Sequence, residues 1–437
     1  MNICVIGTGY VGLVTGVVFA DLGNDVICVD KDEKKIELLK AGKSPIYEPG
    51  VEELIERGIE EGRLVFSTDI NESIKRSEVV FIAVGTPSLP SGESDLSQVE
   101  EVAKSIALSL NGYKIIVNKS TVPVGSGNNV RDLILKYRNG KNDFDVVSNP
   151  EFLREGQAVY DTLHPDRIVI GATNHSAALK IVELYAPLER PMLMTDLASA
   201  ELIKYASNCF LALKISYINA LSQLCESVNA DIALVAKGMG ADSRIGPSFL
   251  QAGLGYGGSC LPKDVAALIA TSQRFGCDAS MLKAVQVINT EQPKHFVDKI
   301  KKALGGLDGK TIAVLGLSFK PNTDDLREAK SIEIIRYLLS EKALVKAYDP
   351  AAMENFKRFH PTITYANSPY DAAQDADAVV LITEWNEFKQ LNLDRLRSVV
   401  KQPYLFDGRN IYDPTRVRRS GFCYEGVGRA HNGEAIE

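Results

Sequence analysis

The chain has 437 residues, of which 45% are hydrophobic and 24% are charged, and its formal net charge is -7. This length is enough for two or three domains, each with its own hydrophobic core. The negative charge argues against nucleic acid as a partner. The chain has no run of about 18 apolar residues and no secretory leader, so we expect neither a membrane span nor export.

The seven cysteines and five histidines are scattered along the chain. The cysteines include no C-x-x-C pair, which favours free thiols and a reducing, cytoplasmic location. The histidines have no spacing that is typical of metal ligands. We therefore predict no metal site.

The first thirty residues predict a dinucleotide-binding unit. A buried strand precedes the sequence GTGYVG at residues 7–12, and a helix is expected over residues 13–22. Gly7 permits a tight turn, Gly9 lets the backbone approach a pyrophosphate, and Gly12 allows close packing of the helix. The helix N-terminus offers unpaired N–H groups to the anion.

An acidic residue ends the second predicted strand, residues 25–29. Asp30 follows Gly7 by roughly 20 residues, the spacing at which a carboxylate accepts from the adenosine ribose 2'-hydroxyl and repels a 2'-phosphate. This acid favours NAD over NADP. The same sheet is expected to continue through strands at 79–84 and 115–117, and ligands meet such sheets at the carboxyl ends of the strands.

A second region with the same order of elements begins after a glycine-rich turn at residues 305–309. The expected elements are strands at 311–315, 344–348 and 378–382 and a helix at 331–339. The full glycine fingerprint is missing there, so we predict that this half binds a nucleotide in another way, with Lys320 and Arg327 as candidate phosphate partners. The polar tail at residues 428–437 is expected to be loose.

Between the two halves, residues 195–228 have apolar side chains at helical spacing and contain neither proline nor glycine. We expect one long linking helix, which would span on the order of 45 Å and leave an apolar stripe for a second subunit. On pattern alone, a helix buried within one chain explains the stripe equally well. The expected fold is α/β, with two Rossmann-like doubly wound domains joined by a long central helix.

A glycine-rich loop, GYGGSCLPKD at residues 255–264, carries a candidate nucleophile, Cys260. Pro262 suits the first position of a helix that continues over residues 265–274 to Gly276 as a stop signal. The thiol would lie just outside a helix N-terminus, where the positive end of the dipole favours a thiolate. A thiolate that attacks an aldehyde gives a thiohemiacetal, and a nicotinamide can oxidise this to a thioester. One site could thus carry an alcohol to an acid.

Three polar pairs are spaced four residues apart, so each shares one face wherever its segment is helical. They are Lys204 and Asn208, Glu151 and Glu155, and Cys260 and Asp264. Pro150 would allow a helix to start before Glu151. Each pair taken alone is more often a solvated face, but their joint presence favours a functional site.

Four long motifs in order resemble the UDP-glucose/GDP-mannose dehydrogenase family. They are GTGYVG at 7–12, KSTVPVG at 119–125, NPEFLREG at 149–156 and GGSCLPKD at 257–264, and GLSFK at 316–320 extends the resemblance nearly end to end. The family implies a four-electron oxidation of a sugar C6 hydroxyl to a carboxylate, with two NAD molecules in succession and no metal. It also implies an NAD-binding Rossmann domain at 1–195, a central helical linking and dimerisation domain at 196–300, and a Rossmann-like UDP-sugar-binding domain at 301–437.

The resemblance assigns catalytic roles to six positions of this chain: Cys260, Lys204, Asn208, Asp264, Glu151 and Thr121. Cys260 would be the nucleophile, and Lys204 and Asn208 would stabilise the oxyanion. Asp264 would hold a water or the lysine for proton transfer. Glu151 would activate water for thioester hydrolysis.

On the same resemblance, further residues contact the two ligands. The NAD contacts would be Gly7, Gly9, Tyr10, Val11, Gly12, Asp30, Lys35, Thr86, Thr121, Glu155, Lys263 and Arg327. The nucleotide-sugar contacts would be Phe152, Leu153, Arg154, Glu155, Lys204, Asn208, Arg244, Phe249, Leu250, Gln251, Ala252, Gly253, Gly257 and Lys320. Arg244 would come from a neighbouring subunit, so a homodimer would be the smallest working unit. Gln251 stands where some relatives have a lysine, so the phosphate grip there would be weaker or supplied elsewhere.

Residues 156–171 resemble the glucose-specific branch of the family, which makes UDP-glucose the expected substrate and UDP-glucuronate the expected product. UDP-N-acetylmannosamine and GDP-mannose are the alternatives within the family. A non-catalytic module that binds a nucleotide sugar or NAD would need no reactive thiol. A two-electron dehydrogenase of a small hydroxy acid would need neither Cys260 nor a second nucleotide-type domain.

Overall fold

The computed structural model describes residues 1–138, 140 and 143–429. The backbone forms two compact units, the first made of Met1–Ser207 with Ala266–Cys277 and the second of Asn208–Val265 with the chain from Asp278 onward. The three-domain boundaries expected from the sequence stay a prediction, because a split by compactness does not separate a linking segment from the units that it joins. The expectation of a loose tail is wrong at Gly428, whose N–H donates to Glu226 Oε1 at 2.7 Å and whose carbonyl accepts from the Ile232 N–H at 2.8 Å. The rest of that tail, from residue 430 onward, lies outside the described residues.

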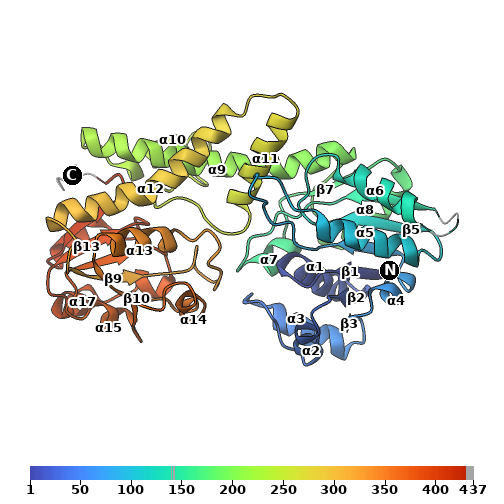
Figure 1. Cartoon of the computed structure of the whole chain (residues 1–437), viewed down its shortest axis with the longest axis horizontal. Coiled ribbons are helices and arrows are strands. Elements are labelled where there is room, and N and C mark those ends of the chain that lie inside the picture. The colour runs from blue at the N-terminus through green and yellow to red at the C-terminus, as the bar shows by residue number, and fades with distance from the viewer. Residues whose placement is uncertain (139, 141–142, 430–437) are drawn as a thin grey trace. The chain divides into compact units, whose positions relative to one another are not determined.

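The first unit is built on an eight-stranded sheet in the order β3-β2-β1-β4-β5-β6-β7-β8 (Figure 1). Its strands are β1 Asn2–Ile6, β2 Asp25–Val29, β3 Leu64–Ser67, β4 Val79–Ile82, β5 Lys114–Asn118, β6 Phe144–Ser148, β7 Ile168–Ala172 and β8 Met192–Thr195. The central pairs are parallel, whereas β6 and β7 are antiparallel. This is the doubly wound order, in which the strand sequence reverses between β1 and β4 and ligands bind at the carboxyl ends there.

Helices cover both faces of this sheet. They are α1 Tyr10–Asp21, α2 Glu33–Lys40, α3 Val51–Glu60, α4 Ile70–Lys75, α5 Ser97–Ser109, α6 Ser126–Tyr137, α7 Ala158–Leu163, α8 His175–Tyr185 and the 3-10 turn Ala186–Leu188. One core packs α1, α3 and α8 against Val5 and Phe81, and the other packs α5 and α6 against Cys4 and Val80. Because successive strand residues point to opposite faces and both faces are covered, β4, with the sequence VVFI, is apolar at every position.

The second unit contains a parallel six-stranded sheet in the order β11-β10-β9-β12-β13-β14. Its strands are β9 Thr311–Leu315, β10 Leu344–Tyr348, β11 Thr364–Tyr365, β12 Ala378–Leu381, β13 Tyr404–Asp407 and β14 Cys423–Gly426. Its helices are α10 Ile232–Gly240, α12 Ser280–Leu304, α13 Lys330–Ser340, α14 Met353–Lys357, α15 Pro369–Ala373, α16 Asn386–Lys389, α17 Leu393–Val399 and α18 Pro414–Arg419. The second Rossmann-like region expected after residue 309 is therefore confirmed.

Two helices belong to both units: α9, Leu197–Val228, and α11, Leu261–Arg274. The 32 residues of α9 confirm the long helix expected over 195–228. At 1.5 Å per residue it extends about 48 Å. Phe210, Leu224 and Val228 on α9 are exposed. No helix in the described part of the chain is long and apolar enough to cross a membrane.

Candidate active site

The turn between β1 and α1 has the geometry of a dinucleotide-binding loop. Gly7 has φ +103°, in the left-handed region that glycine tolerates, and its N–H donates to the Val29 carbonyl at 2.7 Å. A Cβ on Gly12 would lie 1.9 Å from the Gly7 oxygen, so a larger residue would push α1 away from the turn. A Cβ on Gly9 would meet none of the described atoms within 4 Å. The backbone at Gly9 is thus open to a ligand, and Tyr10 and Val11 follow it in the first turn of α1.

Asp30 follows β2 and faces the glycine turn. Its Oδ2 accepts from the Thr8 N–H at 2.9 Å and from the Thr8 hydroxyl at 2.8 Å, and its Oδ1 accepts from the Asp32 N–H at 3.0 Å. Desolvation raises the pKa of Asp30, but these hydrogen bonds and the charge of Lys35 outweigh it, so the pKa lies below its usual value. A half-buried carboxylate at this strand end fits the ribose of NAD and disfavours a 2'-phosphate. The residues of this turn therefore fit the cofactor.

The second sheet has an acid at the equivalent place, Asp349 after β10, but protein donors occupy its carboxylate. Oδ2 accepts from the Leu317 N–H at 2.7 Å and from Trp385 Nε1 at 3.1 Å. Oδ1 accepts from the N–H groups of Ala351 and Ala352, both at 2.8 Å. A fully buried carboxylate engaged in this way is not available to a ribose. This geometry argues against a second dinucleotide site of the same kind.

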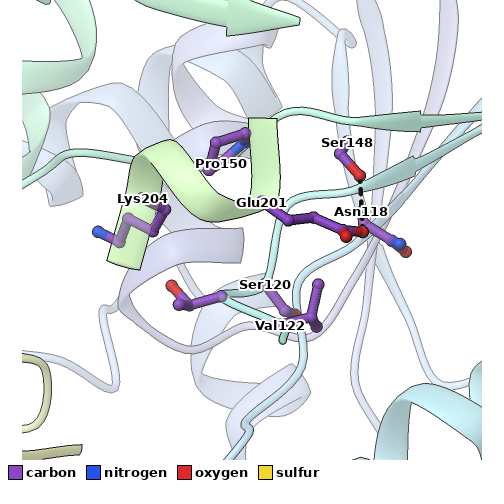
Figure 2. A pocket seen from close by; sticks show the side chains of 8 residues that line it. Asn118, Ser120, Val122, Ser148, Pro150, Glu201 and Lys204 are labelled. Carbon is purple, nitrogen blue, oxygen red and sulfur yellow. Dashed lines mark hydrogen bonds between the residues drawn. The ribbon is translucent and has the colours of Figure 1, made fainter. Parts of the chain in front are cut away.

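The segment that follows β5 borders a small pocket (Figure 2). The pocket is lined by Asn118, Ser120, Thr121, Val122, Ser148, Pro150, Glu201 and Lys204. Two expected catalytic residues, Thr121 and Lys204, thus border the same space. The Thr86 hydroxyl donates to the Thr121 carbonyl at 2.8 Å. The carboxyl ends of β4 and β5 therefore bring together the two threonines expected to contact NAD.

Lys204 on α9 forms a buried ion pair with Glu151. Lys204 Nζ lies 2.9 Å from Glu151 Oε1, and the two side chains are 4% and 6% exposed. Glu151 Oε2 also accepts from the Leu153 N–H at 2.8 Å. Lys204 Nζ lies 5.4 Å from the centroid of the Phe152 ring. An ion pair buried in this way is held in one geometry, as is required of groups that move a proton or stabilise an oxyanion.

The segment that contains Glu151 and Glu155 is a loop, so the condition under which the two would share a helical face is not met. Helix α7 begins only at Ala158. The Glu48 carboxylate, from a distant part of the chain, accepts from the N–H groups of Gly156 and Ala158 at 2.6 and 2.7 Å. Side-chain acceptors thus take the backbone donors that a helix would have paired with carbonyls. Glu155 is itself buried, at 8% exposure.

A buried lysine that was not among the expected site residues, Lys119, lies beside this loop. Lys119 Nζ donates to Asn149 Oδ1 at 3.1 Å and to the Tyr185 hydroxyl at 3.0 Å, and that hydroxyl donates to Asn149 Oδ1 at 2.6 Å. Burial lowers the pKa of Lys119 to about 8; Glu151 raises it and Lys204 lowers it. The only signal in the sequence was its position at the start of the KSTVPVG motif.

Cys260 immediately precedes α11, and its carbonyl accepts from the Asp264 N–H at 2.9 Å. The expected helix start at this loop is therefore confirmed. The thiol is half-buried and lies 3.5 Å from the Ser259 hydroxyl. By contrast, Cys28 is fully buried, and desolvation raises the pKa of its thiol to about 12. Cys260 thus has the accessibility and the helix position of a reactive thiol.

Asp264 lies one helical turn after Cys260 and is ordered by two side chains. Asn208 Nδ2 donates to Asp264 Oδ2 at 2.6 Å, and Lys263 Nζ donates to Oδ1 at 2.5 Å. The Asp264 side chain is 1% exposed. Asn208 lies one turn after Lys204 on α9. The second unit therefore assembles Asn208, Cys260 and Asp264, and the first unit assembles Glu151 and Lys204 beside the Thr121 pocket.

The loop before Cys260 packs against the loop after β9. The Gly258 N–H donates to the Arg327 carbonyl at 2.9 Å. A Cβ on Gly257 would lie 2.2 Å from the Glu328 carbonyl oxygen, so this close approach requires glycine. The thiol loop and the segment that carries an expected phosphate partner are therefore neighbours within the second unit.

Three arginines expected to contact ligands each bind an acidic neighbour. The pairs are Arg154 with Asp161 at 2.7 Å, Arg244 with Asp242 at 2.6 Å and Arg327 with Asp325 at 2.6 Å. The arginine side chains are 58%, 87% and 58% exposed, in the same order. Exposed pairs are weak because water screens them, so an anionic ligand can compete for these guanidinium groups.

The expected sugar segment at residues 249–253 is anchored at its end. The Gly253 N–H donates to Asn219 Oδ1, and the Gly253 carbonyl accepts from Gln292 Nε2, both at 2.8 Å. Phe249 has φ +65°, while Leu250 and Ala252 are buried and Gln251 is exposed. Lys320 Nζ lies 5.4 Å from the centroid of the Phe319 ring. The segment is thus anchored through Gly253 on the same unit as the thiol loop.

Family models and relatives match the chain along nearly its whole length. The models of the UDP-glucose/GDP-mannose dehydrogenase family match as the NAD binding domain at residues 1–189, the central domain at 198–291 and the UDP binding domain at 313–414. UDP-glucose 6-dehydrogenase TuaD of Bacillus subtilis (strain 168) is 49% identical over 98% of this chain and 93% of its own length. UDP-glucose 6-dehydrogenase of Rhizobium meliloti (strain 1021) is 48% identical over 98% of this chain and 100% of its own length.

Solved structures agree with these matches. A UDP-glucose dehydrogenase from the hyperthermophilic archaeon Pyrobaculum islandicum has a TM-score of 0.92 at 39% identity and covers 98% of both chains. A UDP-D-ManNAc dehydrogenase from Pyrococcus horikoshii has a TM-score of 0.87 at 26% identity and covers 99% of this chain and 100% of its own. Together with the dinucleotide turn and the Cys260 loop, these matches show that the chain belongs to the UDP-glucose/GDP-mannose dehydrogenase family and is an NAD-dependent enzyme.

Proposed function

We propose that the chain oxidises the C6 hydroxyl of UDP-glucose to the carboxylate of UDP-glucuronate in a four-electron reaction. The observation that carries this proposal is Cys260, a half-buried thiol at the start of α11, one helical turn from a carboxylate that two side chains hold in place. A two-electron dehydrogenase has no use for such a thiol. The glucose assignment is supported by the two curated relatives described above, which are UDP-glucose 6-dehydrogenases.

In the proposed reaction the alcohol loses a hydride and a proton, and the Cys260 thiolate adds to the resulting aldehyde carbon to form a thiohemiacetal. Loss of a second hydride gives a thioester, and water then cleaves the C–S bond to release the carboxylate and restore the thiol. NAD, when bound, supplies the hydride acceptor for each oxidation. One alcohol, two NAD⁺ and one water give one carboxylate, two NADH and three protons.

The side chains around the reaction have separate roles in this proposal. Lys204 and Asn208 stabilise the oxyanion of the thiohemiacetal, and their spacing of one turn on α9 supports a shared role. Asp264 holds a water or the lysine for proton transfer, which its ordering by Asn208 and Lys263 supports. Glu151 activates the water that hydrolyses the thioester.

The remaining expected residues are proposed as ligand contacts. The proposed NAD contacts include the β1–α1 turn, Thr86 and Thr121, and the proposed sugar contacts include residues 249–253 and Gly257. A homodimer is proposed as the working unit, with Arg244 reaching the neighbouring subunit. The 87% exposure of the Arg244 side chain supports this, as do the exposed apolar side chains of α9. Two-fold assemblies of this kind bury apolar helix faces.

The purified chain should be assayed with NAD and each of UDP-glucose, UDP-N-acetylmannosamine and GDP-mannose, with NADH followed by absorbance and the products by mass. We expect UDP-glucose to be preferred and to yield two NADH per sugar. One NADH per sugar would show a two-electron dehydrogenase. No NADH with any of the three sugars would favour a binding module.

A further inference from the structure

Glu201, near the start of α9, is a buried carboxylate that none of the roles above uses. It is 3% exposed. Its Oε2 accepts from the Gly125 N–H at 2.7 Å, and its Oε1 accepts from the Gly127 N–H at 2.7 Å. Its Oε1 also accepts from the Ser148 hydroxyl at 3.2 Å (Figure 2). Both oxygens of one carboxylate thus tie α9 to the turn that begins α6.

This turn is the end of the segment that carries Thr121. Gly125 has φ +97°, and a Cβ on Gly127 would lie 3.1 Å from Glu201 Oε1. The two glycines therefore allow the backbone N–H groups to close on the carboxylate. Because only a few residues separate Thr121 from Gly125, the position of the Thr121 backbone depends on this contact.

Glu201 also lies three residues before Lys204, so the two side chains are neighbours on one face of α9. Both border the pocket that Thr121 and Asn118 help to line (Figure 2). A charged acceptor with two backbone donors is among the stronger hydrogen-bonded arrangements in proteins. Glu201 therefore connects the helix that carries Lys204 to the loop that carries Thr121.

We propose that Glu201 is a positioning residue that fixes the Thr121 turn relative to the turn of α9 that carries Lys204. It thereby sets both NAD affinity and the rate of sugar oxidation. The rate part rests on the proposed function. The affinity part rests on NAD binding, which the family membership establishes, and on Thr121 as a proposed NAD contact.

The isosteric variant Glu201→Gln tests this positioning role directly. An amide has one acceptor oxygen and one donor nitrogen, so its NH2 group would face a backbone N–H of Gly125 or Gly127. Two donors cannot pair, and the turn must move away from α9. Glu201→Asp keeps both acceptor oxygens on a shorter side chain, so it should restore part of what glutamine loses.

The experiment measures NAD binding by calorimetry and steady-state kinetics with UDP-glucose on the full chain. For Glu201→Gln we expect the Kd of NAD to rise roughly three- to tenfold and kcat to fall roughly 10- to 100-fold, because small displacements of catalytic groups are costly. Glu201→Asp should give intermediate values for both. The wild-type chain supplies the reference for each constant.

The matched control is Asp196→Ala, at the start of the same helix. The Asp196 carboxylate accepts from the Ser199 N–H at 2.8 Å and from the Ser199 hydroxyl at 2.7 Å, so it stabilises α9 through contacts with the helix itself. We expect this variant to unfold at a lower temperature but to keep the NAD Kd and kcat within about twofold of wild type.

The proposal would be overturned if Glu201→Gln folds and keeps the wild-type NAD Kd and kcat while only its unfolding temperature falls. Glu201 would then have a structural role alone. If Glu201→Gln does not fold, the NAD Kd and kcat of Glu201→Asp test the proposal instead, and wild-type values of both would overturn it. Because NAD binding needs no turnover, an unchanged Kd counts against the proposal even when UDP-glucose is not a substrate. A wild-type chain that binds NAD but leaves UDP-glucose unreacted counts against the proposed function alone.

Discussion

Lys204 and Glu151 form a buried ion pair, with Nζ 2.9 Å from Oε1 and side chains that are 4% and 6% exposed. Removal of either charge leaves the other without its partner in surroundings of low dielectric, which destabilises a protein by roughly 3–5 kcal/mol. The same two side chains are proposed to act at different stages of the reaction. Stability and chemistry must therefore be measured separately in every variant of this pair.

Glu151→Gln should separate oxidation from hydrolysis. The amide oxygen still accepts from Lys204 but cannot take a proton from water, so the thioester should accumulate. We expect a rapid burst of about two NADH per site followed by a steady-state rate reduced roughly 100-fold or more. Stopped-flow absorbance measures the burst, and mass spectrometry of the quenched protein should detect the sugar on Cys260. A slow rate without a burst would place Glu151 before the thioester.

Cys260→Ser should abolish acid formation and leave ligand binding intact. A serine hydroxyl is not ionised near neutral pH, so the covalent step fails and kcat should fall by roughly 10³-fold or more, with Kd values for NAD and UDP-glucose within about twofold of wild type. We expect a trapped aldehyde in place of the acid. Cys277→Ser, which changes an exposed thiol, is the control and should keep the wild-type rate. Unchanged NADH production by Cys260→Ser would defeat the covalent mechanism.

Asp30→Ala should weaken NAD binding and relax the preference for NAD over NADP. The variant removes both the acceptor for the ribose and the charge that repels a 2'-phosphate, so the ratio of the two Kd values should change roughly 10- to 100-fold. Calorimetric titration with each cofactor measures this ratio. Asp349→Ala is the matched control, because that carboxylate binds only protein groups in the contacts described above. Asp349→Ala should lower stability without altering the ratio of the NAD and NADP Kd values. If Asp30→Ala leaves this ratio unchanged, Asp30 is not the residue that contacts the ribose.

Lys119 should make the stability of the protein depend on pH. Burial lowers its pKa from 10.5 to about 8 in the folded chain. Between these values the unfolded chain holds more protons than the folded chain, so stability rises with pH across this window. Below about pH 8 the lysine is charged in both states, and the full cost of burying the charge is present.

Lys119→Met removes this titration. The free energy of unfolding of the variant minus that of the wild type should therefore fall as pH rises from 7 to 10, by up to about 3 kcal/mol. Urea unfolding at several pH values measures the difference. Lys31→Met, at a side chain that is 80% exposed, controls for the loss of a lysine and should show a difference that does not vary with pH. A constant difference for Lys119→Met would mean that Lys119 is not held in a desolvated site.

The elements whose signals are local could be predicted from the amino-acid sequence. The turn between β1 and α1, the acid after β2, the long helix α9 and the helix start after Cys260 all follow from glycine placement, periodicity and capping within short segments. The same local signals misled at Glu151 and Glu155, where Pro150 suggested a helix. Glu48, 108 residues before Gly156, takes the donor of that residue instead.

The contacts between distant side chains could not be predicted in this way and became known from the folded chain. Lys204 and Glu151 are 53 residues apart, Glu201 and Gly125 are 76 apart, and Lys119 and Tyr185 are 66 apart. No periodicity encodes such pairs, because they depend on the order of strands in the sheet and on which faces of α9 and α8 are buried. Burial then gives these charged groups their fixed geometry, since a charge removed from water must keep its partner.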